Sequence, residues 1–477
     1  MSRLAALSLV AVVAGCQASP APTPSLATQS PAATSIPRTT EPTLSPGPTP
    51  TSPPPPTATN VPTATATPTA VPAPTSSPVV GDARTLGWQA DLHTLISARE
   101  AAHPDPWVGI SRAEYVAAVE SVVARIPELD DDQMLVETTR LAAMPTWNGR
   151  DGHGGIFPWI ETTKGLHAYP LRLYWFSDGL FVVDALPPYE DLIGSRVDDI
   201  AGHPLDRVVH AASPLLPRDN DMNLLSLSPR LIVVPEILRG LGLIDSATAP
   251  ASFTVTGAEG ASDVAIEPIT LGSFRSWNAG VRVLSPPPRS GGPLWLENLE
   301  SACWWEVIPG TSTAYVGFNQ VDANSVSTAT QLSTALDEGA FDRLIVDLRH
   351  NGGGDNTTYH ALLSVVQRAA EELPGGVYML IGRVTFSAAG NFSTEVERTT
   401  DAVFVGEDLG ASPNLYGDTV TTTLGHSGLS FRVAARYWEK GTADDERITI
   451  EPALEVLLSS ADYFGDVDPV LDAVLSE

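Results

Sequence analysis

The chain has 477 residues, with 27 Lys and Arg against 56 Asp and Glu, and its formal net charge is −29 at pH 7. This acidity argues against binding to nucleic acid, which depends on the neutralisation of phosphates by Lys and Arg. It also argues against electrostatic adhesion to anionic lipid. No His, Cys, Asp and Glu spacing typical of a metal site occurs, so we expect neither a metal nor a cofactor.

The first 16 residues have the organisation of an export signal. A short basic start, Met1 to Arg3, precedes an apolar run that is too short to cross a bilayer as a mature helix. The run ends in Val13-Ala-Gly-Cys16, which resembles the bacterial lipobox. That resemblance implies a lipid anchor on Cys16 and a place on the extracytoplasmic face of a membrane. The alternative is an ordinary secretory signal with an incidental cysteine.

Residues 17–81 are mainly Pro, Thr, Ser and Ala with almost no charge, so we expect a disordered linker that acts as a semi-rigid stalk. The remaining residues are ordinary globular sequence. The second cysteine, Cys303, has no partner once Cys16 belongs to the signal, and we expect it to be a buried thiol rather than part of a disulfide.

Residues 82–160 are predicted to form a helical subdomain. Apolar residues recur at helical spacing in three stretches between Leu86 and Ala143. Ser111, with Glu114 three residues later, is a candidate capping box for the second helix. The subdomain ends in a glycine-rich loop, residues 149–155.

Residues 165–275 are predicted to be rich in β-strands. Segments 171–176 and 179–184 flank Ser177 and Asp178, a hairpin signal. A strand–turn–strand pattern over 192–205, followed by a short helix from Asp206, resembles PDZ domains, which capture chain ends by β-augmentation. An unrelated β-hairpin is the alternative.

Residues 300–477 alternate between strands and helices. The strands are predicted at 313–318, 343–348 and 377–381, and the helices at 326–338 and 359–372. This order favours a parallel sheet with helical crossovers. A closing helix within 466–475 has an Asp cap and a Pro in its first turn.

Two segments of this part carry chemistry. In the first, a buried strand ends in Asp347-Leu-Arg349, and three glycines follow, Gly352 to Gly354. Ligand sites in open α/β sheets lie at such strand ends, and glycine backbone supplies N–H groups that suit an oxyanion hole. The lysine of a phosphate-binding loop is absent, which argues against nucleotides.

In the second segment, the strand 377–381 leads into small residues that begin a helix. Ser387 is predicted at the N-terminus of that helix, where backbone amides favour developing negative charge. A plain helix-capping serine is the alternative.

Together these two segments resemble the tail-specific (C-terminal processing) serine peptidases and their tricorn-type relatives. The resemblance covers nearly the whole chain beyond residue 85. It implies an α/β fold with a ClpP/crotonase-like core, an N-terminal helical subdomain and a PDZ-like β-rich insert. It further implies that Ser387 is the nucleophile and that N–H groups of Gly353 or Gly354 and of Ala388 stabilise the oxyanion.

The family has two catalytic variants. One needs a lysine about twenty-five residues after the serine, and the only lysines here are Lys164 and Lys440, which excludes it. The other uses a histidine from the end of the helical subdomain, which implies that His153 is the general base. Asp151 is its neighbour, either orienting the loop or pairing with the imidazole. A surface-loop histidine is the alternative.

The tricorn-type relatives orient the base with a glutamate near the chain end, which points to Glu446, with Asp445 and Glu439 as runners-up. The turn that follows reads Ile450-Glu-Pro-Ala453 where the family pattern has a final Asp, so the alignment is weaker here. A solvated loop charge is the alternative for Glu446.

The resemblance therefore predicts a serine peptidase that hydrolyses exported polypeptides through Ser387, His153 and Glu446. An inactive relative that binds peptides or cell-wall material is the alternative from another class. An acyl-CoA enzyme of the crotonase type is disfavoured by export, because CoA is not expected at the cell surface. The sequence carries no signal for an oligomeric state.

Overall fold

The computed structural model describes residues 82–148, 150–277 and 291–477. The export signal with Cys16 and the predicted linker lie outside these residues, so both assignments stay predictions. The described residues belong to one compact unit of the chain. None of its described helices has the length and apolar character needed to cross a membrane.

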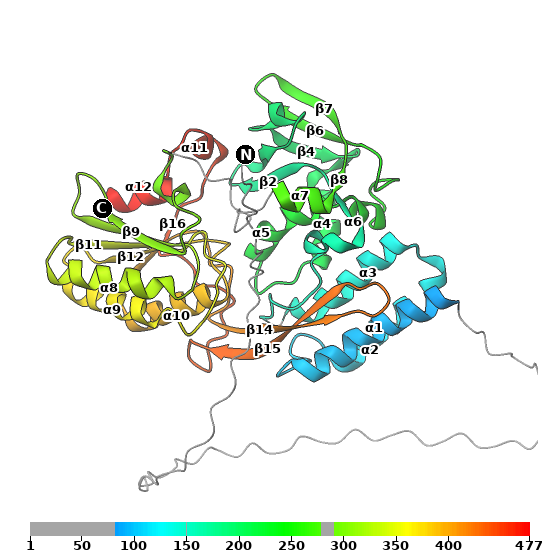
Figure 1. Ribbon diagram of the computed structural model, residues 1–477, viewed down its shortest axis with the longest axis horizontal. Coiled ribbons are helices and arrows are strands. Elements are labelled where there is room, and N and C mark those ends of the chain that lie inside the picture. The colour runs from blue at the N-terminus through cyan, green and yellow to red at the C-terminus, as the bar shows by residue number, and fades with distance from the viewer. Residues whose placement is uncertain (1–81, 149, 278–290) are drawn as a thin grey trace, which may run out of the picture. The chain divides into compact units, whose positions relative to one another are not determined.

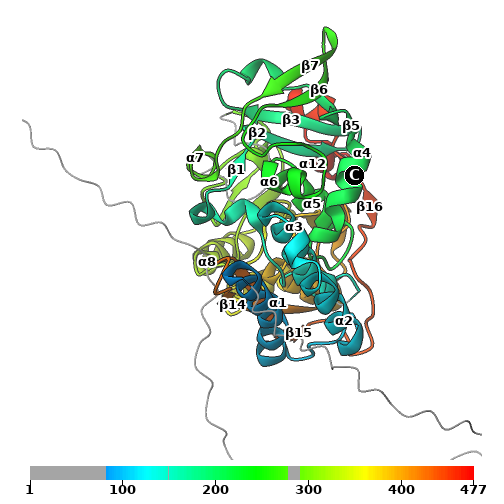
Figure 2. The ribbon, with the colours of Figure 1, turned by 90° about the vertical axis from the view of Figure 1, so that its right-hand side faces the viewer.

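The first part is helical, as predicted. It contains α1 (Ala83–Ala102), α2 (Arg112–Val123) and α3 (Asp131–Ala143), which pack against one another (Figures 1 and 2). The capping box at the start of α2 is confirmed, because Ser111 accepts from the backbone N–H of Glu114 and the Glu114 carboxylate accepts from that of Ser111. The buried faces of these helices belong to one large apolar core that continues into the next part of the chain.

The second part contains an antiparallel sheet covered by short helices (Figure 1). In spatial order its strands are β2 (Leu171–Phe176), β3 (Gly179–Ala185), β4 (Arg196–Ile200), β6 (Ala251–Gly257) and β7 (Gly260–Ile266). The predicted hairpin is β2–β3, and the predicted strand–turn–strand is β4 with β5 (His203–Pro204), followed by α4 (Leu205–Ala212).

The sequence did not predict the helices that complete this part or its small second sheet. The helices are α5 (Met222–Leu231), α6 (Pro235–Gly240) and α7 (Leu271–Trp277), and the second sheet pairs β1 (His167–Ala168) with β8 (Ile269–Thr270). Pro229 lies inside α5 and Pro235 opens α6, so proline obscured the helical pattern. The PDZ-like assignment stays a prediction.

The third part is a six-stranded sheet, so the fold is mixed α/β. Its strands in spatial order are β16 (Leu454–Glu455), β13 (Val403–Gly406), β12 (Val377–Ile381), β11 (Arg343–Asp347), β10 (Thr313–Phe318) and β9 (Cys303–Val307). All neighbours run parallel except β9, which is antiparallel to β10. The predicted parallel sheet is thereby confirmed. Its ClpP/crotonase-like character stays a prediction.

Helices cover both faces of this sheet. α8 (Asn324–Asp337), α9 (His360–Glu372) and α10 (Ala388–Thr399) bury one apolar cluster with it, and α12 (Pro469–Leu475) buries another on the opposite face (Figure 1). A short helix, α11 (Ser460–Phe464), precedes α12. Cys303 is 8% exposed, and burial raises the pKa of its thiol to about 12, as expected of a structural cysteine.

A long hairpin, which the sequence analysis missed, leaves this third part. Its strands are β14 (Asn414–Thr423) and β15 (Ser430–Glu439), and it runs alongside α1 (Figure 1). Asp91 of α1 accepts the backbone N–H groups of His426 and Ser427 in the hairpin turn, at 2.9 and 2.7 Å. The hairpin therefore joins the helical part to the part that carries Ser387.

Candidate active site

Ser387 lies between β12 and α10 and is the last residue before the helix. Its backbone has φ 56° and ψ −126°, and a non-glycine residue at positive φ is strained by about 1–3 kcal/mol. It occupies the N-cap position, but its side chain makes no capping hydrogen bond. The residue is partly exposed. The hydroxyl is therefore not engaged in capping the helix, unlike that of an ordinary N-cap serine.

The Asp-Leu-Arg motif at the end of β11 forms an ion-pair network at the carboxyl end of the sheet. The Arg349 guanidinium binds Asp347 and also Asp468, the N-cap of α12, at 2.8 Å. Tyr315 donates its hydroxyl to Asp347 at 2.6 Å. Burial opposes ionisation of Asp347, but Arg349 and Tyr315 hold the pKa of its carboxyl below the usual value. The charged residues of the motif are thus structural, and of the three glycines that follow them Gly353 lies against Ser387.

Of the two glycines predicted for the oxyanion hole, Gly353 is the one that lies against Ser387. A Cβ added to Gly353 would lie 2.6 Å from the Cβ of Ser387 and 2.9 Å from the amide nitrogen of Ala388. However, the N–H of Gly353 already donates to the Oδ1 of Asn351 at 3.0 Å. Within the described residues no hydrogen bond is recorded for the amides of Gly354 and Ala388. Unlike the N–H of Gly353, these two amides are therefore not engaged by a described residue.

His153 lies next to the segment of the nucleophile but makes no hydrogen bond to Ser387. Its ring stacks on Phe386, the residue before Ser387, with centroids 4.4 Å apart and planes at 27°. Both ring nitrogens are buried, and neither makes a hydrogen bond of full geometry with a described residue, although the backbone of Tyr416 lies close enough to act on the ring. Burial lowers the pKa of the imidazole to about 4, although the charges of Asp151 and Asp418 oppose that shift. The neutral form, which can accept a proton, is therefore favoured.

The loop that carries His153 is docked on the β14–β15 hairpin. Gly155 and Arg432 of β15 exchange two backbone hydrogen bonds, each 2.9 Å long. Tyr416 of β14 donates its N–H to the carbonyl of Arg150 at 3.0 Å. Gly417 of β14 leaves room for the ring, since a Cβ there would lie 3.6 Å from the Cε1 of His153. The base is thus placed by backbone pairing to a distant hairpin.

Asp151 anchors this loop to the helical part. Its carboxylate pairs with Arg99 at 3.0 Å and with the Nε2 of His103 at 3.3 Å, and all three side chains are buried. The ring of His103 in turn packs on Tyr416, with centroids 4.6 Å apart. Of the two roles expected for Asp151, the geometry fits orientation of the loop, because its carboxylate is turned toward Arg99 and His103.

The structure does not bring the predicted third member to the base. Glu446 is exposed, and within the described residues no hydrogen bond or ion pair joins it to His153. Asp445 pairs with Arg447 instead, which holds the pKa of its carboxyl below the usual value, and Glu439 is exposed on β15. The assignment of Glu446 stays a prediction without geometric support.

Sequence reasoning missed two acidic residues near the base. Asp418, on β14, is half-buried, and its charge acts on His153. Asp219 is buried and accepts the N–H of Gly152, next to His153, at 2.6 Å. A signal for Asp219 existed in the polar run 218–223, which lies between apolar stretches, whereas Asp418 had no distinguishing pattern.

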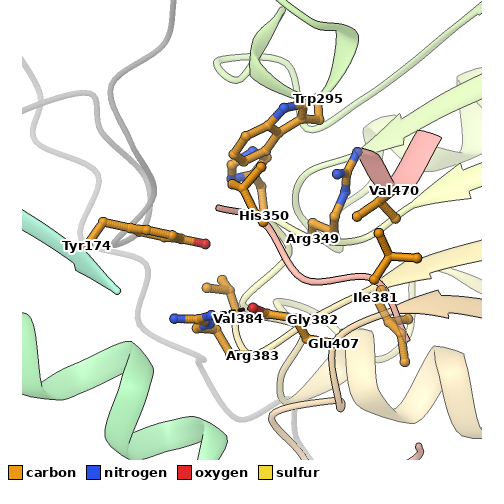
Figure 3. Close-up of a pocket in the computed structure, with 13 residues that line it drawn as sticks. Tyr174, Trp295, Arg349, His350, Ile381, Gly382, Arg383, Val384, Glu407 and Val470 are labelled. Carbon is orange, nitrogen blue, oxygen red and sulfur yellow. Dashed lines mark hydrogen bonds and ion pairs between the residues drawn. The ribbon is translucent and has the colours of Figure 1, made fainter. Parts of the chain in front are cut away.

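A pocket with about 470 Å³ of empty volume opens at the carboxyl ends of β11, β12 and β13 (Figure 3). Arg349 lies against Trp295, at 5.1 Å from the ring centroid, and Arg383 lies against Tyr174 at 5.2 Å. Arg383 also pairs with Glu407 and donates to the carbonyl of Trp175 in β2 at 2.8 Å. The pocket therefore lies where β2 meets the segment that leads into Ser387.

The described residues contain no group of three or more His, Cys, Asp or Glu side chains arranged to hold a metal ion.

Comparisons with known proteins bear on the fold. No family model matches the chain, and no curated protein matches it. Among solved structures, mature CPAF in complex with lactacystin is similar, at 12% identity and a TM-score of 0.55 over 82% of this chain and 98% of that one. A point mutant of CPAF gives 12% identity and a TM-score of 0.57 over 82% of this chain and 96% of CPAF.

The described chain has the fold of CPAF. A photosystem II D1 C-terminal processing protease is a more distant neighbour, with 12% identity and a TM-score of 0.37 over 77% of this chain and 93% of that one. Other neighbours are named as a tricorn protease and as an S41 protease from Bacteroides fragilis. The fold shared with CPAF agrees with the resemblance to tail-specific peptidases drawn from the two sequence motifs.

Proposed function

We propose that this chain is a serine peptidase that cleaves exported polypeptides, with Ser387 as nucleophile and His153 as general base. One observation carries the proposal. A serine held at positive φ at a helix N-terminus, with no capping bond, faces Gly353 while a neutral histidine stacks on the preceding residue. Neighbours with this fold are serine peptidases, which supports the same reading.

In the proposed reaction the Oγ of Ser387 attacks the peptide carbonyl carbon, and the hydroxyl proton passes to His153. The carbonyl oxygen becomes an oxyanion, which the N–H groups of Gly354 and Ala388 stabilise together with the N-terminus of α10. Collapse breaks the C–N bond, and His153 gives its proton to the leaving amine. Water then hydrolyses the acyl-enzyme by the same route and restores the Ser387 hydroxyl.

The acid that supports protonated His153 is proposed to be Asp418 rather than Glu446. Asp418 is on β14, the strand that lines the imidazole, and its charge favours the protonated ring. Asp151 acts on the ring more strongly, but its carboxylate pairs with the buried Arg99 and His103, whereas Asp418 pairs with the exposed Arg436 at 3.5 Å. A negative charge near the base stabilises the imidazolium that forms in the transition state.

The substrate class and the location are proposals from the sequence. The lipobox-like Cys16 and the Pro-rich stretch 17–81 support a lipid-anchored enzyme on the extracytoplasmic face of a membrane. The PDZ-like β4–β5 pattern supports capture of polypeptide ends, as expected of a C-terminal processing peptidase.

The test is labelling and turnover by the purified full-length chain. We expect a fluorophosphonate to label Ser387 and an unfolded protein to be cleaved, with both activities lost by roughly a hundredfold or more in Ser387→Ala and His153→Ala. A folded wild-type chain that binds peptides but neither labels nor cleaves would instead identify a peptide-binding relative.

A further inference from the structure

The segment 219–223 lies between the two halves of the proposed site and contributes three buried polar side chains. Asp219, Asn220 and Asn223 are 6%, 7% and 6% exposed, respectively, and all three side chains bond to backbone groups. Buried polar side chains are normally fully hydrogen-bonded, because an unpaired one is costly. Here the partners come from segments far away in the sequence.

On one side the segment holds the loop of the base. The Oδ1 of Asp219 accepts the N–H of Gly152 at 2.6 Å, one residue before His153. A Cβ added to Gly152 would lie 3.0 Å from Asp219 Oδ1 and 3.0 Å from the ring of Phe386. The histidine loop therefore packs at Gly152 against both Asp219 and Phe386, the residue before Ser387.

On the other side the segment holds the loop that follows β13. The Oδ2 of Asp219 accepts the N–H of Ser412 at 3.0 Å. The Nδ2 of Asn223 donates to the carbonyl of Gly410 at 2.8 Å, and the Nδ2 of Asn220 donates to that of Leu409 at 2.9 Å.

This loop is packed directly on the nucleophile's segment. A Cβ added to Gly390 of α10 would lie 2.7 Å from the Cβ of Ala411. Gly410 abuts the carbonyl of Arg383, in the stretch that leads into Ser387. A shift of this loop therefore moves the segment and the helix that hold the nucleophile.

We infer that Asp219 is a positioning residue, whose carboxyl group fixes the distance between His153 and Ser387 by accepting the N–H groups of Gly152 and Ser412 at once, in its neutral and in its ionised form. This inference rests on the proposed peptidase function. Asp219 does not take part in bond making. It acts because a displacement of about 1 Å in a catalytic group lowers the rate by roughly a hundredfold.

A matched control exists in Asp91 of α1. It is also buried, at 1% exposure, and its carboxylate also accepts two backbone N–H groups, those of His426 and Ser427. Those groups belong to the hairpin turn and not to the histidine loop. Asp91→Asn therefore removes the same kind of contact at the hairpin turn, outside the pairs Gly155–Arg432 and Tyr416–Arg150 that hold the histidine loop.

The experiment compares Asp219→Asn with Asp91→Asn in the full-length chain. We expect Asp219→Asn to lower kcat and the rate of fluorophosphonate labelling by roughly 10- to 100-fold, with KM within about twofold. Asp91→Asn is expected to lower the melting temperature comparably and to keep the labelling rate within about twofold of wild type. Asp219→Ala, which removes both acceptors, should lose more activity than Asp219→Asn.

The inference is overturned if folded Asp219→Asn labels and turns over at the rate of Asp91→Asn. If Asp219→Asn does not fold, Asn223→Ala replaces it, because that variant frees only the carbonyl of Gly410 and the N–H groups of Asp219 and Asn220. If no variant folds, the segment is a folding element and the inference is rejected. A wild-type chain without labelling or turnover would overturn the proposed function itself.

Discussion

The two halves of the proposed site are built by different means. On the serine side the contacts are mostly local to the sheet edge: Phe386 donates its N–H to the carbonyl of Asn351 at 3.1 Å, and the Thr385 hydroxyl donates to that of Leu348 at 2.9 Å. On the histidine side the partners are Asp219, Tyr416 and Arg432, far from the loop in sequence. The nucleophile is thus set by its own sheet, whereas the base is set by three remote segments.

The largest expected effect comes from filling the space beside the serine. Gly353 has φ 103°, and a Cβ there would lie 2.6 Å from the Cβ of Ser387. Gly353→Ala is therefore expected to lower kcat/KM and Ser387 labelling by roughly a hundredfold or more, through strain and displacement together. Gly352→Ala is the control, because a Cβ there meets nothing within 4 Å. Equal activity of the two variants would contradict the close approach of Gly353.

The pH dependence of turnover tests whether the pKa of His153 is lowered. Burial lowers the pKa of His153 to about 4, so the imidazole is neutral and able to accept a proton well below pH 6.5. We expect kcat/KM to change less than about twofold between pH 6.5 and about 5, and to fall below that as the ring becomes protonated. A base with the ordinary pKa would lose roughly 15-fold over the same range. A profile of kcat/KM against pH on an unfolded protein separates the two.

The matching perturbation on the histidine side is Gly152→Ala. A Cβ there would lie 3.0 Å from both Asp219 Oδ1 and the Phe386 ring and 3.1 Å from the backbone nitrogen of Asp219, so side chains and backbone would each have to shift by a few tenths of an ångström. We expect kcat to fall roughly tenfold with little change in KM, a smaller effect than at Gly353. Gly425→Ala, where a Cβ meets nothing within 4 Å, should keep wild-type kcat. A larger loss for Gly152→Ala than for Gly353→Ala would reverse the comparison.

This contrast explains what the sequence could predict. The segments around Asp347 and Ser387 are short, each sits on one strand end, and the spacing between them fixes the serine side. The strands β10 and β12 were predicted with the bounds that the structure has, because each is a continuous apolar run. The motif did not reveal that Asn351 would engage the N–H of Gly353.

The sequence located the histidine loop but did not predict the residues that hold it in place. The glycines around His153 marked a loop. Its partners lie on a hairpin in which the second half of each strand is largely exposed and carries little apolar periodicity. Asp219 lies in a region read as β-rich, and only the three-dimensional fold brings it to Gly152. The orienting acid was sought near the chain end because the tricorn-type resemblance implies a glutamate there, and Glu446 proves to be exposed.

A smaller effect distinguishes the candidate acids. We expect Asp418→Asn to lower kcat/KM about fivefold, because it removes a charge that favours protonated His153. Glu446→Gln is expected to stay within about twofold of wild type, since a single exposed charge has little influence at a distance. Parallel measurements of kcat/KM decide between them. The opposite result would return Glu446 to the third position of the site.

The smallest effect is a change in how stability depends on pH. Burial raises the pKa of Asp219 to about 7, although the N–H groups of Ser412 and Gly152 oppose that shift. Between about pH 4 and 7 the folded chain therefore holds a proton on Asp219 that the unfolded chain has released. Asp219 alone then makes the free energy of unfolding fall as pH rises, by at most about 1.4 kcal/mol per pH unit. His153 acts in the opposite direction, because its folded pKa of about 4 lies below the ordinary 6.5.

These two slopes oppose each other between about pH 4 and 6.5, so the wild-type chain should show little net dependence from this pair in that range. Asp219→Asn removes the falling contribution and leaves the rising one from His153. We therefore expect the free energy of unfolding of this variant, measured with urea at several pH values, to rise with pH relative to wild type. His153→Gln should change the slope in the opposite sense. If Asp219→Asn leaves the slope unaltered, Asp219 is ionised in the folded chain, and its two amide contacts alone outweigh the cost of burying the charge.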